Sequence, residues 1–500
     1  MMKYAKRAST LLLALLIVGS LLPMGTCALG EDQSYSYNYD LVGNALPGPD
    51  PYEVRYQLDV SDFVEGKLKA ATSVFVAGDM LYICDTGNNR ILRFELTASE
   101  PVFVDELKGT DEWQLSAPED VFVSEAGDIY IADTGNKRIL WLNSDLSIEK
   151  IIERPTDALF DSFQEFKPSK LVSTGGGRLY VQATGVNRGL LEFDEFGEFV
   201  GFMGASNVAF DWEDYIWKLF STDAQKSQME SFVPTEYNNV ALDANGRIYT
   251  TTSIFEVMDL YSGSADPVRK LNLKGKDILI RNNSLVIGDT TWGQDGPSRF
   301  RDVTVLENDI YFVLDTTKKR IFAYDGQGSN LYVFGGYGTK AGYFTNPVSL
   351  EHWGDDLIVL DTASTLITVM KPTEYGATIQ SAIESYNEGR YADAMALWEE
   401  VLRKNGNYIL AYDGIGKIML RNGEYEKSLD YLEYADDDYY YSQAWKLFRK
   451  DWIERYLGWA IVALLAFVLI LFGTKVYNRE RSALEDYEER KRYLSEKQSR

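Results

Sequence analysis

Apolar and polar residues alternate in short runs over residues 52–372, and clusters of Gly, Asp and Asn separate the runs. In one unit an apolar run at 121–123 is followed by turn residues at 126–128 and a second apolar run at 129–131. Alternation with a period of two is typical of β-strands, and Gly and Asp favour the tight turns that join paired strands. The pattern predicts a long series of short antiparallel strands.

A self-similar unit recurs within this region. Its clearest copies read Ile-Cys-Asp-Thr-Gly-Asn-Asn-Arg-Ile at 83–91 and Ile-Ala-Asp-Thr-Gly-Asn-Lys-Arg-Ile at 131–139. Aligning the Asp of this motif gives six copies, with Asp85, Asp133, Ala183, Thr252, Asp315 and Asp361 at the corner position. Four copies have an arginine five residues later: Arg90, Arg138, Arg188 and Arg320. Four strand-like runs in about 45–50 residues make a propeller blade, so six copies predict a closed six-bladed β-propeller.

The corner motif Asp-Thr-Gly-Asn-x-Arg-Ile and the glycine-rich crossing at 338–347 resemble the repeats of the NHL family. The resemblance covers about residues 52–372 and implies a mainly β, six-bladed propeller. It is poor in the third and fourth copies. The fourth lacks the corner Asp and Arg, and 205–236 is read as a helical insertion before it. The alternating stretch 52–58 precedes the first copy. We expect it to complete blade six as the outermost strand, because this removes an exposed sheet edge.

After Pro372 the pattern becomes helical. Four pairs of residues recur with a spacing of 34: Gly389 and Gly423, Tyr391 and Tyr425, Ala394 and Ser428, Trp398 and Leu432. This spacing resembles tetratricopeptide (TPR) repeats over about 376–436, with Gly406 in place of the final proline of the pattern. Ala382 and Gly416 are the small residues expected where the two helices of each repeat approach. A third helix at about 439–450 is expected to cap this TPR-like domain, which spans 376–450.

Both ends of the chain carry apolar segments. Residues 1–30 contain basic residues, an apolar stretch at 11–22 and then small residues, which is the layout of a secretory signal peptide. Residues 31–51 are read as an N-terminal linker. The segment 452–474 is long enough to cross a bilayer as a helix. Basic residues in 475–500 favour a cytoplasmic tail, so a single-pass membrane protein is expected, with its propeller and TPR-like domain outside the cytoplasm.

The amino-acid composition limits the binding and catalytic functions that the chain can have. The chain carries 50 Lys and Arg against 75 Asp and Glu, and its net charge of −25 disfavours binding to nucleic acid. Because His352 is its one histidine, a histidine-rich metal site is excluded and Ser-His or Cys-His catalysis is disfavoured. Cys84 lies within a predicted strand and is expected to be buried and unreactive. Cys27 leaves a lipoprotein anchor open as an alternative.

Candidate binding residues follow from aligning the innermost strands. The position before each first apolar residue is polar in all six copies: Ser73, Asp120, Lys170, Asn239, Asp302 and Ser349. We expect these residues to form a ring at the mouth of the central channel. Two interpretations stay open: a site for a small polar ligand or a cation, and a solvated channel lining.

Other notable residues are read as structural or as partner contacts. The repeated corner Asp and Arg residues are expected to satisfy backbone groups and to pair a half-buried charge in each turn. His352, beside Trp353 in the first strand of blade six, is expected to be a packing residue whose polar atoms are satisfied within the protein. In the TPR-like groove, Tyr386 and Lys417 are expected to face a peptide partner.

The function expected from these features is that of a non-enzymatic, membrane-anchored recognition module, binding a protein or glycan partner outside the cell. It needs no cofactor, and neither catalytic residues nor metal ligands are assigned. The resemblance to bacterial NHL-plus-TPR membrane proteins implies a role beside a carbohydrate uptake system. The alternative is a lactonase- or lyase-like enzyme, since relatives of this fold hold a metal in the channel. Asp120, Asn239 and Asp302 would then bind a divalent cation, and oxygen ligands without histidine suit calcium.

Overall fold

The computed structural model describes residues 36–40, 43–157, 160, 165–186, 188–204, 237–252, 266–281, 288–289 and 296–498. The chain divides into two compact units, Met1–Tyr408 and Ile409–Arg500, and each is described by itself. The predicted signal peptide at 1–30, the insertion at 205–236 and Cys27 lie outside the described residues.

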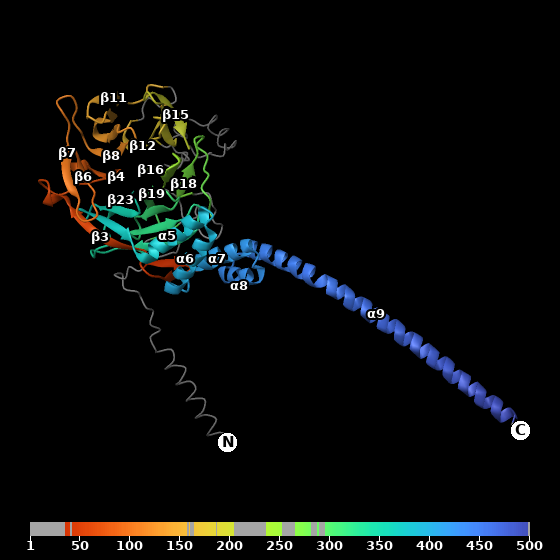
Figure 1. Ribbon diagram of the computed structural model, residues 1–500. Helices are drawn as coiled ribbons and strands as arrows, with labels where there is room; N and C mark the ends of the chain where they lie inside the picture. The colour runs from red at the N-terminus through yellow and green to blue at the C-terminus, as the bar shows by residue number, and fades with distance from the viewer. Residues whose placement is uncertain are drawn as a thin grey trace, which may run out of the picture. The chain divides into compact units, whose positions relative to one another are not determined.

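In the first unit, antiparallel sheets surround a central axis and form a six-bladed β-propeller (Figure 1). Blade one contains β4 (Ser73–Ala77), β5 (Met80–Asp85), β6 (Arg90–Glu95) and β7 (Val102–Leu107). Blade two contains β8 (Pro118–Val123), β9 (Ile129–Asp133), β10 (Arg138–Leu142) and β11 (Ile148–Ile152). Blade three contains β12 (Pro168–Ser173), β13 (Leu179–Ala183), β14 (Leu190–Phe193) and β15 (Phe199–Met203). In each blade the strands pair in sequence order, starting from the strand nearest the axis.

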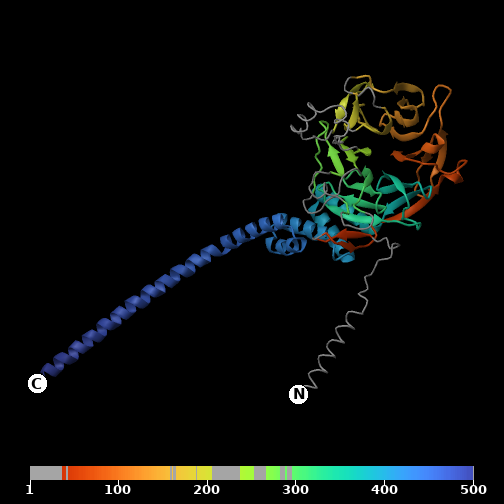
Figure 2. The same ribbon diagram turned by 180° about the vertical axis from the view of Figure 1, so that it is seen from behind.

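The other blades complete the ring. Among the described residues, blade four contains β16 (Asn239–Leu242), β17 (Ile248–Thr251) and β18 (Val268–Leu271). Blade five contains β19 (Phe300–Val305), β20 (Tyr311–Asp315), β21 (Arg320–Tyr324) and β22 (Asn330–Gly335). Blade six contains β23 (Pro347–Trp353), β24 (Asp356–Asp361) and β25 (Leu366–Pro372). Its fourth strand is β3 (Tyr52–Asp59), which pairs antiparallel with β25, so the predicted closure by residues 52–58 is confirmed (Figure 2).

A short N-terminal hairpin was missed by the sequence analysis. Strands β1 (Tyr37–Tyr39) and β2 (Ala45–Pro47) pair with each other, and β1 pairs with β22, which extends blade five outward. The assignment of 31–51 to a linker is therefore wrong for these two strands. A three-residue strand is too short to show alternation. The turn did leave a signal, because the carboxylate of Asp40 accepts the backbone N–H of Asn44 at 2.7 Å.

The strand register confirms the alignment of the six divergent sequence repeats. In every blade the polar residue at the start of the innermost strand pairs with the residue just before the corner position. The six pairs are Ser73–Cys84, Asp120–Ala132, Lys170–Gln182, Asn239–Thr251, Asp302–Leu314 and Ser349–Leu360. The rule holds in blades three and four, which lack the corner Asp, because backbone hydrogen bonds set the register.

The corner motif is a structural turn, as expected. Asp85 accepts hydrogen bonds of 2.8 Å from the backbone N–H of Lys69, from Asn88 Nδ2 and from Arg90 Nε. Asp133 repeats this set with Ser116, Asn136 and Arg138, also at 2.8 Å. In both corners a 3-10 turn, η2 (Thr86–Asn88) or η3 (Thr134–Asn136), connects the second strand to the third. The repeated Asp and Arg side chains of these two corners therefore form the hydrogen bonds that hold the turn.

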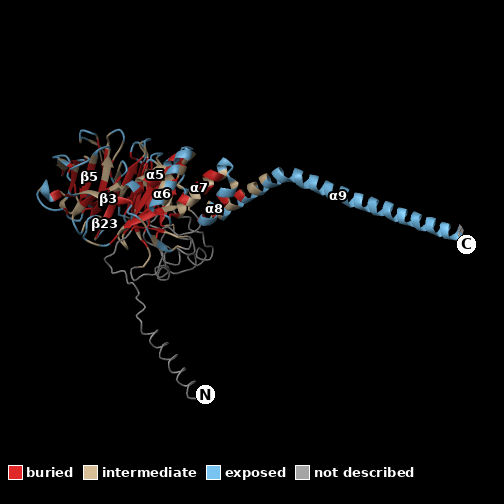
Figure 3. Cartoon of the chain, turned by 60° about the horizontal axis from the view of Figure 1, so that its bottom comes forward, coloured by how far each residue is buried: buried red, intermediate tan, exposed pale blue. Residues whose placement is uncertain are grey.

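Apolar side chains fill the spaces between blades, and the buried residues concentrate in the strands (Figure 3). One cluster joins Ile83 and Leu92 of blade one to Ile358 and Leu360 of blade six, so the first and last blades pack against each other. The 3-10 turn η1 (Val60–Asp62) places Val60 in the same cluster. This packing, together with the β3–β25 pairing, closes the ring.

Two helices of the first unit belong to the propeller body. These are α5 (Glu374–Asn387), capped by the Thr373 hydroxyl, and α6 (Tyr391–Lys404). Gln380 Nε2 donates to the hydroxyls of Tyr52 at 2.9 Å and Tyr332 at 3.2 Å, and Tyr408 donates to the carbonyl of Leu331 at 3.0 Å. Buried hydrogen bonds therefore fix the helical hairpin to blades five and six.

The second unit is entirely helical in its described part. It contains α7 (Ile409–Asn422), α8 (Tyr425–Ala435) and α9 (Asp438–Gln498). A Cβ on Gly416 would lie 2.7 Å from the side chain of Leu432, so this glycine allows α7 and α8 to approach closely. The Ser428 hydroxyl also donates to the Gly416 carbonyl at 2.8 Å. The boundary between the two compact units, at Tyr408 and Ile409, falls within the predicted domain 376–450.

Helix α9 runs without interruption through the predicted cap, span and tail. It is long and apolar enough to cross a membrane, and its apolar residues from Leu457 to Phe472 are exposed (Figure 3). Trp452 and Tyr456 precede this stretch, Trp459 lies near its start, and all three are exposed. The helix is a candidate membrane span, and a bilayer would cover its exposed apolar surface.

Candidate functional site

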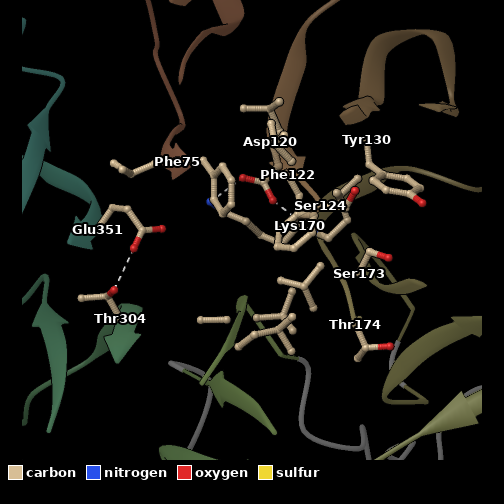
Figure 4. A pocket seen from close by; sticks show the side chains of 18 of the residues that line it. Phe75, Asp120, Phe122, Ser124, Tyr130, Lys170, Ser173, Thr174, Thr304 and Glu351 are labelled. Carbon is tan, nitrogen blue, oxygen red and sulfur yellow. Dashed lines mark hydrogen bonds and ion pairs between the residues drawn. The ribbon is translucent and has the colours of Figure 1, made fainter. Parts of the chain in front are cut away.

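A cavity of about 750 Å³ occupies the centre of the propeller, and the innermost strand of every blade contributes to its lining (Figure 4). It begins at the starts of these strands and reaches the turns after β8, β12 and β16, at 124–128, 174–177 and 243–246. We call these turns the rim. Since every blade contributes to it, the cavity is the natural candidate site.

All six residues predicted from the repeat alignment line this cavity. They are Ser73, Asp120, Lys170, Asn239, Asp302 and Ser349, and we call them the floor ring. In four blades a β-bulge precedes the ring residue, with the extra residue at Glu119, Ser169, Arg301 and Val348. A bulge re-aims the side chain that follows it, which explains why the ring residues turn toward the axis.

The floor ring is hydrogen-bonded across blades one to three. Ser73 donates to the carboxylate of Asp120, and Lys170 Nζ donates to Ser73 Oγ at 2.9 Å. Lys170 Nζ also donates to Asp120 Oδ1 at 3.2 Å (Figure 4). The second oxygen of Asp120 accepts the backbone N–H of Leu171 at 2.9 Å. Asp120 thus links the innermost strands of blades one, two and three.

The same arrangement recurs on the other side of the ring. Asn239 donates to Asp302 Oδ1, and Asp302 Oδ2 accepts the backbone N–H of Leu350 at 2.8 Å. Ser349 Oγ accepts the backbone N–H of Val74 at 3.2 Å, which joins blade six to blade one. In three blades, therefore, the ring residue accepts a backbone N–H from the blade that follows. The ring fastens the inner strands together.

These contacts define the position of the ring. The exposed fractions of Ser73, Asp120, Asn239, Asp302 and Ser349 are 5% or less, whereas Glu125 and Asn245 in the rim are exposed. Five of the six ring residues are therefore buried and form what we call the floor of the cavity, while the rim is its more exposed end. The mutual bonds of these five residues differ from the freely solvated lining that was one of the two expected interpretations.

Burial and charge compete in the floor ring. Burial raises the pKa of Asp302 to about 6, although the Lys170 charge and the Leu350 amide act against it. Burial disfavours the Lys170 ammonium, but the carboxylates of Asp120 and Asp302 outweigh this cost and raise the pKa of Lys170. Cys84 lies behind the ring, and burial raises the pKa of its thiol well above the usual range. As expected, Cys84 is a buried, unreactive residue.

Above the floor, the cavity wall combines aromatic and hydroxyl side chains. We define the wall as Phe75, Phe122, Tyr130, Ser173, Thr174, Thr304, Glu351 and His352. The rings of Phe75 and Phe122 lie 4.9 Å apart at an angle of 46°. Sequence reasoning missed the wall, but four members stand two residues after a ring position in the same strand: Phe75, Phe122, Thr304 and Glu351. Strand alternation was the available signal, because residues i and i+2 share a face.

His352 has a polar role as well as a packing one. Its Nδ1 lies 2.7 Å from Thr304 Oγ1 and 3.0 Å from Glu351 Oε1. The Thr304 hydroxyl donates to Glu351 at 2.8 Å (Figure 4). Burial disfavours the charged imidazole, but the hydrogen bond and charge of Glu351 outweigh it and raise the pKa of His352. His352 is thus hydrogen-bonded, as expected of a satisfied residue, and it belongs to a polar group in the wall.

The donors in the floor ring do not fit the calcium site of the alternative hypothesis. Asp120 already faces the Lys170 ammonium, and both oxygens of Asp302 accept N–H donors. Across the part of the chain that the structure describes, no group of three or more His, Cys, Asp or Glu residues is arranged to hold a metal ion. A hard cation needs several free oxygen atoms around one point, whereas here the Lys170 ammonium already neutralises Asp120.

The predicted groove residues have intramolecular contacts in their own units. In the first unit, the ring of Tyr386 packs edge-on against Tyr391 at 5.5 Å. In the second unit, Lys417 forms ion pairs with Asp413 and with Asp437, and its ammonium lies 4.5 Å from the centre of the Tyr440 ring. Lys417 is thus held by residues of α7 and α9, and its charge is already balanced.

No family model matches the chain, and no curated protein matches it. Solved structures do match it. A virginiamycin B lyase from Staphylococcus aureus has a TM-score of 0.37 and 12% identity, covering 67% of this chain and 86% of the lyase. A gluconolactonase from Xanthomonas campestris has a TM-score of 0.38 and 11% identity, with coverages of 66% and 98%. A streptogramin B lyase has a TM-score of 0.39 and 11% identity, with coverages of 64% and 98%. These similarities concern the fold alone.

Proposed function

We propose that this chain is a membrane-anchored recognition protein whose propeller binds a small glycan in its central cavity. The observation that carries the proposal is the wall, where aromatic faces lie beside hydroxyl and carboxylate groups in one cavity of about 750 Å³. Sugars are bound by this combination, because their C–H faces pack on aromatic rings while their hydroxyls need donors and acceptors. The floor ring supports the wall and closes the cavity behind the ligand.

The rest of the chain supplies the setting for this activity. We assign the propeller to the NHL type on its corner motif, and α5 to α8 to TPR-like repeats on their 34-residue spacing. Helix α9 is proposed to anchor the protein, with residues 475–500 in the cytoplasm and the propeller outside. A partner in carbohydrate uptake would place the cavity beside a sugar transporter, and this step rests on the family resemblance.

Binding to the cavity is tested by titrating full-length protein in detergent with a panel of mono- and oligosaccharides in a calorimeter. Phe75→Leu alters the wall, and Phe196→Leu is the matched control, since Phe196 is 68% exposed and does not line the cavity. We expect at least one sugar to bind wild type and Phe196→Leu equally, and Phe75→Leu about tenfold more weakly. Equal affinity for all three proteins would place the binding elsewhere.

The membrane topology is tested by labelling whole cells with a maleimide that does not cross membranes. Phe196→Cys introduces a thiol in the propeller, and Ser482→Cys introduces one in the tail. Both positions are exposed, while the native Cys84 is buried. Labelling of the propeller variant alone is expected. Labelling of the tail variant alone would reverse the proposed orientation.

The enzyme alternative and the partner proposal have separate tests. Metal analysis of purified protein is expected to give less than one divalent cation per chain, unchanged by Asp302→Asn. A stoichiometric cation that is lost in this variant would favour a lactonase- or lyase-like enzyme. Crosslinking in intact cells is expected to recover subunits of a sugar transporter, and recovery of none of them would remove the proposed link to carbohydrate uptake.

A further inference from the structure

The cavity lining is strongly acidic. It contains the carboxylic acids Asp120, Glu125, Asp128, Asp243, Asp302 and Glu351, against Lys170 and the titratable His352. A cavity with this balance carries a negative potential, which low-dielectric walls focus into the space between them. Anionic ligands such as phosphates and acidic sugars are therefore disfavoured.

Three of these acids are already neutralised or saturated by the protein. Asp120 pairs with Lys170 at 3.2 Å, and Asp302 accepts from Asn239 and from two backbone N–H groups. Asp243 lies 3.1 Å from Lys270 Nζ and 3.7 Å from Arg247 Nη1. These contacts hold the floor and one rim turn, so they leave no charge for a ligand.

The other three acids have no cationic lysine or arginine against them among the described residues. Glu125 and Asp128 belong to the rim turn of blade two and form no ion pair among the described residues. Glu351 contacts Thr304 and lies 3.0 Å from His352 Nδ1, so it is paired whenever that imidazole is protonated, and the rim acids carry most of the free charge. These acids come from blades two and six and are not gathered as metal ligands. They can attract a ligand charge without coordinating a bare ion.

Two independent features of the wall point to an organic ligand. The neighbouring rings of Phe75 and Phe122 present π-surfaces, which attract cations as well as sugar C–H groups. Ser173 is 4% exposed and lines the cavity, and among the described residues its Oγ has no partner within 3.5 Å; the nearby Tyr130 hydroxyl makes at most a longer contact with it (Figure 4). A buried hydroxyl without a partner costs stability, and a polar group of a ligand would satisfy it.

We propose that the cavity selects a ligand carrying an ammonium group on a small polar frame, such as an amino sugar. The ammonium lies between the rim or wall carboxylates and the aromatic pair, while the frame hydroxyls bond to Ser173 and Thr174. This inference rests on the proposed function, since it names the ligand class of the same cavity. A quaternary ammonium compound would supply the same charge, so the experiment separates the two sources.

The test compares matched ligands that differ in charge alone. Full-length protein in detergent is titrated with glucosamine and glucose at about pH 6.5, where the amine is charged, and then with choline and its neutral isostere 3,3-dimethylbutanol. We expect glucosamine to bind about tenfold more tightly than glucose, with an advantage that shrinks as salt rises from about 0.05 to about 0.5 M. Choline bound more tightly than glucosamine would identify a quaternary ammonium as the ligand.

Variants locate the charge that is recognised. Asp128→Asn in the rim is expected to weaken glucosamine binding about threefold to tenfold without changing glucose binding. Glu351→Gln in the wall is expected to weaken glucosamine binding more than glucose binding. The control is Glu195→Gln, an exposed turn residue of blade three that does not line the cavity. It is expected to change neither affinity.

The outcomes separate this inference from the proposed function. Equal binding of glucosamine and glucose, both lost in Phe75→Leu, would overturn the charge selectivity and leave glycan binding intact. An advantage of glucosamine that survives in Glu351→Gln and Asp128→Asn would also overturn it. Binding of none of the four ligands or of the sugar panel would overturn both.

Discussion

The floor ring and the wall of the cavity lie on the same inner strands, about two residues apart, yet they differ in how their polar groups are used. The ring bonds to itself and to backbone N–H groups of neighbouring blades. The wall leaves Ser173 Oγ without a partner within 3.5 Å, and the rim leaves the acids Glu125 and Asp128 without an ion pair, within the described residues. A polar side chain that faces a channel can therefore be part of the scaffold, whereas the next one on its strand is available to a ligand.

The comparison also explains why the ring is uniformly polar. Six inner strands converge on the axis, and their first backbone N–H groups need acceptors where no sheet continues. Asp120, Asp302 and Ser349 supply such acceptors from the preceding blade. Polarity at the ring is thus a requirement of the closed fold, and evidence for ligand binding has to come from the wall.

The largest expected effect separates two aspartates of blade two. Asp120→Ala leaves the Lys170 ammonium and the Leu171 N–H unpaired in the floor, which costs about 4 kcal/mol in the free energy of unfolding. Asp128→Ala in the rim is expected to cost less than about 0.5 kcal/mol. Urea unfolding of full-length protein, followed by fluorescence, measures both. Similar costs for the two variants would erase the distinction between floor and rim.

A double-mutant cycle tests whether Lys170 acts through the ring. Lys170→Met strands the Asp120 carboxylate and is expected to cost about 3 kcal/mol. Combining it with Asp120→Asn removes the buried charge, so the double variant should recover at least about 1 kcal/mol relative to the sum of the single changes. Additive losses would mean that the two side chains contribute independently.

The raised pKa of Asp302 predicts a pH dependence. Its pKa is about 6 in the folded chain against 3.8 as the ordinary value, so this group's stabilisation is complete below pH 3.8 and is lost as the pH rises through 6. The stability of wild type relative to Asp302→Asn should fall by about 2–3 kcal/mol between pH 4 and pH 7, at about 1.4 kcal/mol per pKa unit. Unfolding of both proteins across this range provides the difference. A constant difference would show that Asp302 is not shifted.

Much of the fold could be predicted because each propeller blade repeats the same pattern of strands and turns. The six inner-strand positions were located even in blade four, where the corner Asp and Arg are missing, since register depends on the backbone and on turn spacing. Closure by residues 52–58 followed from the need to cover an edge. The hairpin of β1 and β2 escaped notice because three-residue strands show no period.

The site was predicted less completely, for a physical reason. Alignment identifies which residues share a level around the axis, but burial and bonding depend on contacts between blades that are distant in sequence. Asp302 and Leu350 are 48 residues apart, and Ser349 and Val74 are 275 apart. Whether the ring was a mouth or a floor could not be derived from spacing. Phe75 and Glu351 were within reach, since each lies two positions after a ring residue.

The smallest expected effect compares two buried serines, one in the floor and one in the wall. Ser349 Oγ accepts the backbone N–H of Val74, so Ser349→Ala leaves that donor unsatisfied and should cost about 1–2 kcal/mol. Ser173 Oγ has no partner in the described structure, so Ser173→Ala removes an unsatisfied polar atom. It should change the free energy of unfolding by less than about 0.5 kcal/mol or increase it.

Ligand binding then reverses the order of the two serines. If the Ser173 hydroxyl is reserved for a ligand, Ser173→Ala should weaken glucosamine binding about threefold, whereas Ser349→Ala should leave it unchanged because its hydroxyl faces a backbone donor. Thermal unfolding with and without ligand measures stability and affinity on the same samples. Equal destabilisation by both changes would mean that Ser173 is already hydrogen-bonded within the fold. The polar groups of the wall, like those of the floor, would then be satisfied by the protein itself.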